Sequence, residues 1–272
     1  MKRRILTANN LNDFQKYLIL QEKSKATTKK YFRDAKVFAD FAGNEEIRKE
    51  IVIAYKEHLR ENHAVRSVNS MLASINSLFA FLGWFDLKIK ALKVQHQVFC
   101  SEEKELTKAE YARLCKAAQS NHNERLNLIL QTICATGIRV SELRFITVEA
   151  VKQSEATVSL KGKTRSIFIV KDLKKKLLRY AAKQNIKSGM IFVTRTSKPI
   201  NRTNIWREMK NLCKKANVNP QKVFPHNLRH LFARVFYNIE KDIAKLADIL
   251  GHSSINTTRI YIISTGTEHR RR

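Results

Sequence analysis

Three short segments in the second half of the chain combine arginine, histidine and tyrosine at spacings that suit phosphate chemistry. The first, ATGIRVSEL, contains Arg139 and, one helical turn later, Glu142. Gly137 can adopt the left-handed conformation that ends a helix, so we expect Arg139 in the first turn of the next one. A cation there is unfavourable unless an anion joins it, and Glu142 could orient the guanidinium. Taken alone, this segment is explained better by a surface Arg–Glu pair.

The other two segments add imidazoles and a phenol. PHNLRH places His226, Arg229 and His230 on one helical face. LGHSSINTTRIY contains His252 next to a glycine that ends a helix, and Tyr261 then lies two turns along the following helix. Together the three segments supply two guanidiniums, two or three imidazoles and a phenol without a pair of carboxylates. That set favours phosphate chemistry without a metal ion.

Other chemistries fit these residues less well. His226 and His230 have the spacing of helical zinc ligands, but the HExxH pattern requires glutamate where Asn227 stands, and no third ligand is evident. The sequence has no GxSxG nucleophile elbow and no P-loop. Its four cysteines lie far apart and form no CxxC pair, which argues against a zinc ribbon or a disulfide framework. We therefore expect no metal and no cofactor.

The charge of the chain indicates a polyanionic partner. Its 272 residues include 52 Lys and Arg against 24 Asp and Glu, a formal net charge of +28. Basic residues exceed acidic ones in both halves, so the charge is not confined to a tail, and nucleic acid is the partner we expect. An anionic membrane surface or a merely soluble basic surface are the alternatives. No apolar segment resembles a signal peptide or a membrane span, so we predict a cytoplasmic protein.

The first hundred residues have helical periodicity. We predict helices around Leu11–Leu18, from Thr27 or Thr28 to Gly43, from about Glu46 to His58, and from Val68 to Gly83. Basic residues lie between their apolar faces, where a solvated surface and a phosphate contact are equally good explanations. The residues that we predict to contact DNA are Lys25, Lys29, Lys30, Arg33, Arg66 and, in the second half, Arg202.

The periodicity lapses before residue 106, and we place the domain boundary there. The predicted organisation is a helical domain over 1–97, a linker over 98–106 and a second domain over 107–272. Thr107 and Glu110 form a capping box that begins the second domain. We predict helices up to about residue 136 and again over 139–147, 172–184, 202–217 and from 225 onward. Alternating apolar residues around the sequence KGKT predict a β-hairpin, and residues 190–193 a short strand.

The three segments resemble the three signature boxes of the tyrosine recombinase family, in the same order and spacing. Each box alone is a modest signal, but their joint occurrence is specific. The resemblance covers the second half closely and the first half only as a helical pattern, in the manner of the compact Xer-type members with a SAM-like core-binding domain. It implies a mainly α-helical protein with a small β-hairpin, shaped as a two-domain C-shaped DNA clamp.

The resemblance also implies roles for individual residues. Arg139 and Arg229 resemble the arginines that bind the scissile phosphate, and Tyr261 resembles the nucleophile that forms a 3′-phosphotyrosyl bond. His226 resembles the residue that helps to deprotonate the tyrosine or to hold the phosphate, and His252 a second donor to the phosphate. Lys161 resembles the general acid that protonates the 5′-oxygen, and Lys163 is the alternative for that role. Glu142 would be a helper.

Family membership would imply a homotetramer on two DNA sites, strand exchange through a Holliday junction, no need for ATP, and in some cases an accessory or second recombinase protein. The polar ending IISTGTEHRRR departs from members whose C-terminal helix docks into a neighbouring protomer. A type IB topoisomerase-like enzyme and a non-catalytic DNA-binding regulator with the same fold are the alternative functions. For each of these functions we expect a cytoplasmic, nucleoid-associated location.

Overall fold

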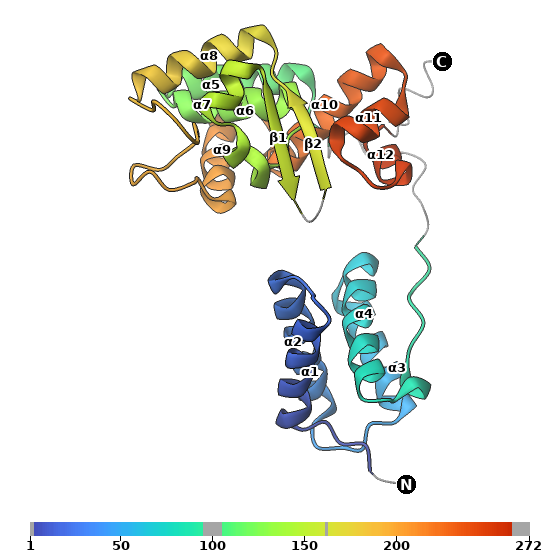
Figure 1. Ribbon diagram of the computed structural model, residues 1–272. Helices are drawn as coiled ribbons and strands as arrows, with labels where there is room; N and C mark the ends of the chain where they lie inside the picture. The colour runs from blue at the N-terminus through green and yellow to red at the C-terminus, as the bar shows by residue number, and fades with distance from the viewer. Residues whose placement is uncertain (1–2, 95–104, 161–162, 263–272) are drawn as a thin grey trace, which may run out of the picture. The chain divides into compact units, whose positions relative to one another are not determined.

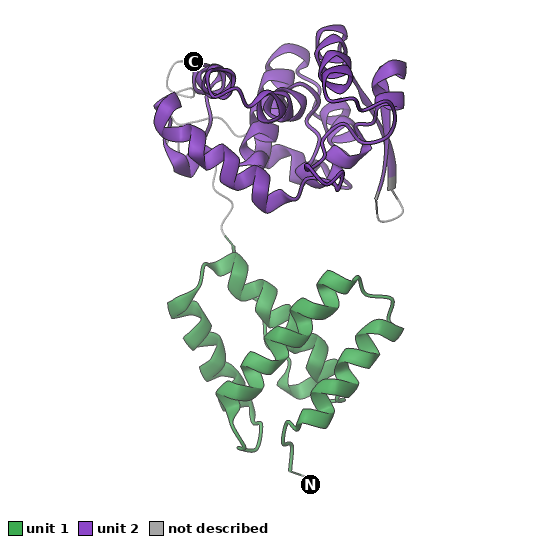
Figure 2. Cartoon of the chain, turned by 90° about the vertical axis from the view of Figure 1, so that its left-hand side faces the viewer, with its two compact units in different colours: residues 1–96 green, residues 97–272 purple. Residues whose placement is uncertain are grey.

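The computed structural model describes residues 3–94, 105–160 and 163–262. The chain divides into two compact units, residues 1–96 and 97–272 (Figure 2). Most of the predicted linker, together with Lys161, lies outside the described residues. In the part of the chain that the structure describes, no helix is both long enough and apolar enough to cross a membrane.

The first unit is a helical bundle with an aromatic core. Phe14, Phe38, Tyr55 and Phe79 are almost completely buried in it. Serine caps the second helix about one turn earlier than predicted, because Ser24 rather than Thr27 accepts the hydrogen bond at its start. The helices are α1 (Ala8–Leu20), α2 (Lys25–Ala42), α3 (Lys49–Asn62) and α4 (Val65–Phe81), followed by the short 3-10 helix η1 (Phe85–Leu87).

The second unit has a larger core built around two long helices. The capping box of Thr107 and Glu110 is present at its start, as predicted. Helix α6 (Glu124–Thr136) is largely buried and packs against α10 (Pro225–Glu240), so these two helices bring distant parts of the chain together (Figure 1). The other helices are α5 (Lys108–Ser120), α7 (Val148–Gln153), α8 (Lys171–Lys183), α9 (Arg202–Ala216), η4 (Pro220–Lys222), α11 (Ile243–Leu250) and α12 (Ile255–Ile262).

The predicted hairpin consists of β1 (Glu155–Leu160) and β2 (Lys163–Phe168). The two strands are antiparallel, with Val158 opposite Arg165. Helix α11 lies beside β2 (Figure 1), so the hairpin reaches the segment that contains His252. The predicted mostly helical fold with one small antiparallel sheet is therefore confirmed.

Two local predictions are wrong. Residues 140–145 form the 3-10 helix η3 (Val140–Phe145) instead of an α-helix over 139–147, because its i→i+3 hydrogen bonds turn the chain more tightly after Gly137. Residues 190–193 form no strand: Met190 and Val193 each make an isolated bridge, to Thr147 and Pro199 respectively. Both segments are too short for periodicity alone to decide their structure.

Candidate active site

Arg229 is the buried centre of the site. It lies on α10, and its side chain is almost inaccessible, at 1% exposure. One Nη donates to the carbonyl oxygen of Gly137 at the end of α6, and the other donates to that of Leu250 at the end of α11, at 2.6 Å. Burial and the neighbouring Arg139 lower the pKa of Arg229 to about 10, so it remains charged at neutral pH. Helix C-termini favour cations, which explains how the fold accepts this buried charge.

His252 connects Arg229 to the last helix. Its Nε2 lies 3.0 Å from Nη2 of Arg229, and its Nδ1 lies 2.9 Å from Oγ1 of Thr258. Because a guanidinium can only donate, Nε2 accepts from Arg229, and the ring proton on Nδ1 is donated to Thr258. Burial, together with Arg229 and Arg139, lowers the pKa of His252 to about 4, which keeps the ring neutral. In this arrangement His252 orients Arg229, whereas the implied donation to phosphate requires a proton on Nε2.

Tyr261 lies on α12 against three imidazoles. Its hydroxyl oxygen is 3.2 Å from Nε2 of His226, and its ring stacks on His230 at a centroid distance of 4.1 Å. The ring of His252 is 5.0 Å away. Burial lowers the pKa of His226, and the positive charges of Arg229, Arg139 and Arg202 lower it further. A neutral His226 can therefore accept a hydrogen bond, and then a proton, from the phenol.

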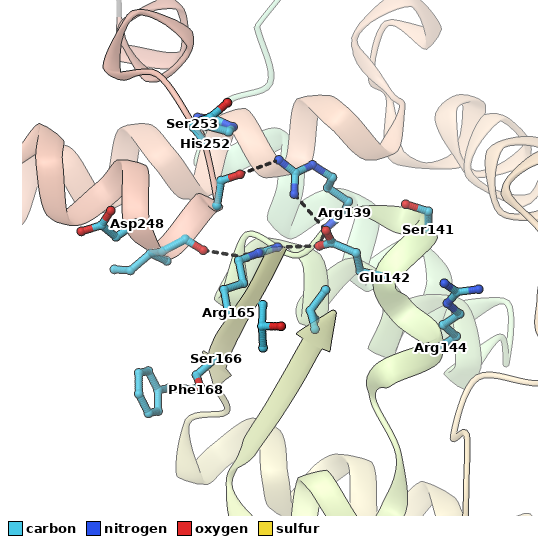
Figure 3. Close-up of a pocket in the computed structure, with 14 residues that line it drawn as sticks. Arg139, Ser141, Glu142, Arg144, Arg165, Ser166, Phe168, Asp248, His252 and Ser253 are labelled. Carbon is cyan, nitrogen blue, oxygen red and sulfur yellow. Dashed lines mark hydrogen bonds and ion pairs between the residues drawn. The ribbon is translucent and has the colours of Figure 1, made fainter. Parts of the chain in front are cut away.

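Arg139 faces a cleft of about 1160 Å³ beside this cluster (Figure 3). Glu142 accepts from its backbone nitrogen and from Nη1, each at 2.9 Å, so the predicted orienting contact between the two residues is present. The other Nη donates to the carbonyl oxygen of Gly251 at 3.3 Å. Burial opposes ionisation of Glu142, but hydrogen bonds from Arg139 and the charge of Arg165 outweigh it and lower its pKa. The Arg139 side chain remains 39% exposed, while that of Glu142 is 2% exposed.

Three arginine side chains donate hydrogen bonds to the turn that ends α11. The consecutive carbonyl oxygens of residues 249, 250 and 251 accept from Arg165, Arg229 and Arg139 respectively. These oxygens lack partners within their own helix, because the last carbonyls of a helix have no following turn. Gly251 makes the turn possible, since its φ of +63° is a conformation that other residues rarely adopt. One local turn thus determines where all three arginines lie.

The structure adds three residues to those assigned from the sequence. His230 lies on the predicted helical face but had no assigned role, and it stacks on Tyr261. Thr258 holds the ring of His252, and a threonine hydroxyl within the third box gave no distinguishing signal. Arg165 has no assigned role either. Its only sequence signal is that it shares the inward face of β2 with Ile167.

The remaining predicted residues lie on other elements or outside the described residues. Lys161 lies outside them, and Lys163 begins β2. Lys25, Lys29 and Arg33 are on α2, Arg66 is exposed on α4, and Arg202 is exposed at the start of α9. Lys30 differs from them, because its ammonium donates to Asp34, to the Ser70 carbonyl and to the Ser74 hydroxyl.

The sequence matches two known family models. The phage integrase family model matches residues 104–268, and the model of the phage integrase N-terminal SAM-like domain matches residues 11–84. The chain belongs to the phage integrase family. The predicted enzyme class is confirmed with it: the protein is a tyrosine recombinase, a DNA strand-transferring enzyme.

Individual relatives cover nearly the whole chain. Tyrosine recombinase XerA of Pyrococcus horikoshii is 30% identical, over 98% of this chain and 93% of that protein. Tyrosine recombinase XerD of Halalkalibacterium halodurans is 29% identical, over 95% of each chain. Among solved structures, a lambda integrase fragment in a dimer bound to a COC′ core site has a TM-score of 0.77 at 18% identity and covers 96% of both chains. A XerA crystal structure has a TM-score of 0.55 at 26% identity and covers 97% of this chain and 96% of that one.

Proposed function

We propose that this recombinase cleaves DNA by attack of the Tyr261 hydroxyl on a backbone phosphate. A Tyr261 Oη–P bond forms and the P–O5′ bond breaks, which leaves a 3′-phosphotyrosyl linkage and a free 5′-hydroxyl. The phenol proton passes to Nε2 of His226. The observation that carries this assignment is the 3.2 Å contact between these two atoms, next to the buried charge of Arg229. Rejoining reverses the step, with the 5′-hydroxyl of another strand as the attacking group.

Arg139 and Arg229 would stabilise the negative charge that grows on the non-bridging oxygens. Arg139 is partly exposed and is held by Glu142, so its remaining donors can meet an incoming phosphate. Arg229 supplies a fixed positive charge immediately behind Tyr261 and His252. This mechanism uses no metal or nucleotide, because guanidiniums provide the charge and the phosphotyrosine conserves the energy of the phosphodiester. Either Lys161 or Lys163 would protonate the 5′-oxygen.

The expected partner is double-stranded DNA, which basic residues of both units would contact. A homotetramer that pairs two sites and exchanges strands through a Holliday junction is the proposed assembly. A structure of the lambda integrase tetramer bound to a Holliday junction, with a TM-score of 0.75, supports it through the shared fold. Participation of an accessory or second recombinase protein, and a cytoplasmic, nucleoid-associated location, are parts of the same proposal.

Trapping on a suicide substrate tests the nucleophile directly. Such a substrate carries a nick next to the cleavage site, so the released fragment diffuses away and the covalent protein–DNA adduct accumulates. We expect the wild-type protein to form an adduct through Tyr261, identified by peptide mapping, and Tyr261→Phe to bind the same DNA without any adduct. Tyr237→Phe, in the last turn of α10, is the matched control and should react normally. An adduct formed by Tyr261→Phe would refute the assignment.

A further inference from the structure

Arg165 occupies a position in the site that none of the assigned roles explains. Its side chain is 11% exposed and donates from Nη2 to Oε2 of Glu142 at 2.5 Å. Its other Nη donates to the carbonyl oxygen of Ile249 at 2.7 Å. Both contacts are visible in the cleft, where Arg165 reaches from β2 toward Glu142 on one side and α11 on the other (Figure 3). A buried guanidinium is costly unless its donors are used, and here both ends of its fork are used.

We propose that Arg165 is a positioning residue for strand cleavage, which locks Arg139 and the turn before His252 into one arrangement. The proposal rests on the function assigned to Tyr261 above. Arg165 acts through two contacts. Through Glu142 it fixes the carboxylate that orients Arg139, and through Ile249 it fixes the first of the three carbonyls that hold the arginines.

The packing of Arg165 against Gly251 supports this role. A Cβ at position 251 would lie 2.6 Å from Cδ and 2.7 Å from Nε of Arg165, so the arginine stem lies directly against the glycine. The carbonyl oxygen of the same glycine accepts from Arg139, and the glycine precedes His252 in the chain. Displacement of Arg165 therefore removes a support from the backbone that holds Arg139 and carries His252.

Arg165 is poorly suited to bind the phosphate itself. Its side chain is only 11% exposed, against 39% for Arg139, so the N–H groups that do not already donate to Ile249 and Glu142 are nearly covered. Arg144 lines the same cleft but is exposed, with its guanidinium 5.0 Å from the ring of Phe145. Replacing Arg144 removes an equal charge from the same cleft without touching Glu142 or Ile249, so Arg144 provides the matched control.

The test is single-turnover cleavage of the suicide substrate at saturating protein, so that differences in affinity do not contribute. We expect Arg165→Met to slow adduct formation by about 100-fold, the size of effect that a small misplacement of a catalytic group produces. Arg144→Met should keep the rate within about threefold of wild type. Arg165→Lys retains the charge but cannot span both acceptors, so an intermediate loss is expected. This variant also carries the test if Arg165→Met does not fold.

Two further measurements distinguish positioning of Arg139 from an independent action on the phosphate or on the leaving group. The Glu142→Gln/Arg165→Met double variant should lose less than the product of the two single losses, because both residues act on Arg139 through the contact between Glu142 and Arg165. A substrate with a 5′-bridging sulfur releases a thiolate, which needs no proton from a general acid, and it should not rescue Arg165→Met. Three results would each overturn the proposal. They are a loss in the double variant equal to the product of the single losses, rescue of Arg165→Met by the sulfur substrate, and a wild-type rate in Arg165→Met. Absence of a Tyr261 adduct with the wild-type protein would instead refute the proposed function.

Discussion

In each unit of this protein a buried carboxylate lies between two basic side chains, and the two arrangements have opposite consequences. Asp34 in the first unit is 1% exposed and accepts from Lys30, Arg33 and Ser74. Glu142 in the second unit is also buried and accepts from Arg139 and Arg165. The two sites look alike as residue sets, but their cations are left with different numbers of unused donors.

The difference lies in what remains available to a phosphate. The ammonium of Lys30 has three donors, and Asp34, Ser70 and Ser74 accept all of them, so Lys30 joins α2 to α4. Arg139 has five donors and keeps several after Glu142 and Gly251 are satisfied. A buried carboxylate can thus help to occupy every donor of a cation, or it can orient a cation that keeps unused donors. The geometry of the donors, more than the charge, determines which occurs.

The largest change in cleavage rate is expected when the contacts of Glu142 in the second unit are broken. Glu142→Gln replaces a carboxylate that accepts from two guanidiniums with an amide whose NH₂ group faces donors. Arg139 then loses its fixed orientation, and we expect single-turnover cleavage to fall by about 100-fold while DNA affinity changes little. Rapid-quench measurement of adduct formation, with a gel-shift assay alongside, separates the two quantities. A rate close to that of the wild type would mean that Glu142 has no orienting function.

The equivalent change in the first unit should affect stability instead of chemistry. Asp34→Ala leaves Lys30, Arg33 and Ser74 without their shared acceptor, but Arg33 is 70% exposed and can turn to water. We expect the free energy of unfolding of the first unit to fall by about 2 kcal/mol, below the range for fully buried pairs. Denaturant unfolding followed by the fluorescence of Trp84 would measure this loss. Cleavage of DNA at saturating protein should continue at the wild-type rate. A large loss of that rate would show that Asp34, like Glu142, affects the chemical step.

The imidazoles of the second unit predict a pH dependence with a definite sign. His226 must be neutral to accept the proton of Tyr261, and burial with three nearby arginines lowers its pKa from the usual 6.5. The cleavage rate should therefore decline only as the pH falls below 6.5, as His226 becomes protonated. Arg202→Met removes one of the positive charges and should move this decline toward higher pH. Single-turnover rates across the acidic range would check both statements, and a shift toward lower pH would contradict the assigned base.

The smallest effect distinguishes two neighbouring residues on α2. Arg33 retains unused donors while it contacts Asp34, whereas Lys30 has none left. Arg33→Met should reduce the slope of log binding constant against log salt concentration by about 0.9, the value for one phosphate contact. Lys30→Met should leave that slope unchanged and should instead lower the unfolding midpoint. Equal slopes for the two variants would contradict the prediction that Arg33 contacts a phosphate and Lys30 does not.

Much of the fold followed from local patterns. Gly137 does end α6 in the left-handed conformation, Thr107 and Glu110 do form a capping box, and the alternation on both sides of the sequence KGKT does produce two paired strands. These features depend on residues within a few positions of one another, so that backbone sterics and local hydrogen bonds decide them. Helix starts were less predictable: Ser24, Thr27 and Thr28 are all competent caps, and only one of them is used.

The sequence by itself determined which residues could perform chemistry, because arginine, histidine and tyrosine in three ordered boxes are a property of residue type and spacing. Only the tertiary structure decided how they are held. Arg229 reaches a carbonyl 92 positions away and Arg165 meets a carboxylate 23 positions away. Two of the three acceptors of Lys30 lie 40 or more positions along the chain. Such contacts depend on how whole helices pack, and no local periodicity encodes which donors a folded chain leaves unused.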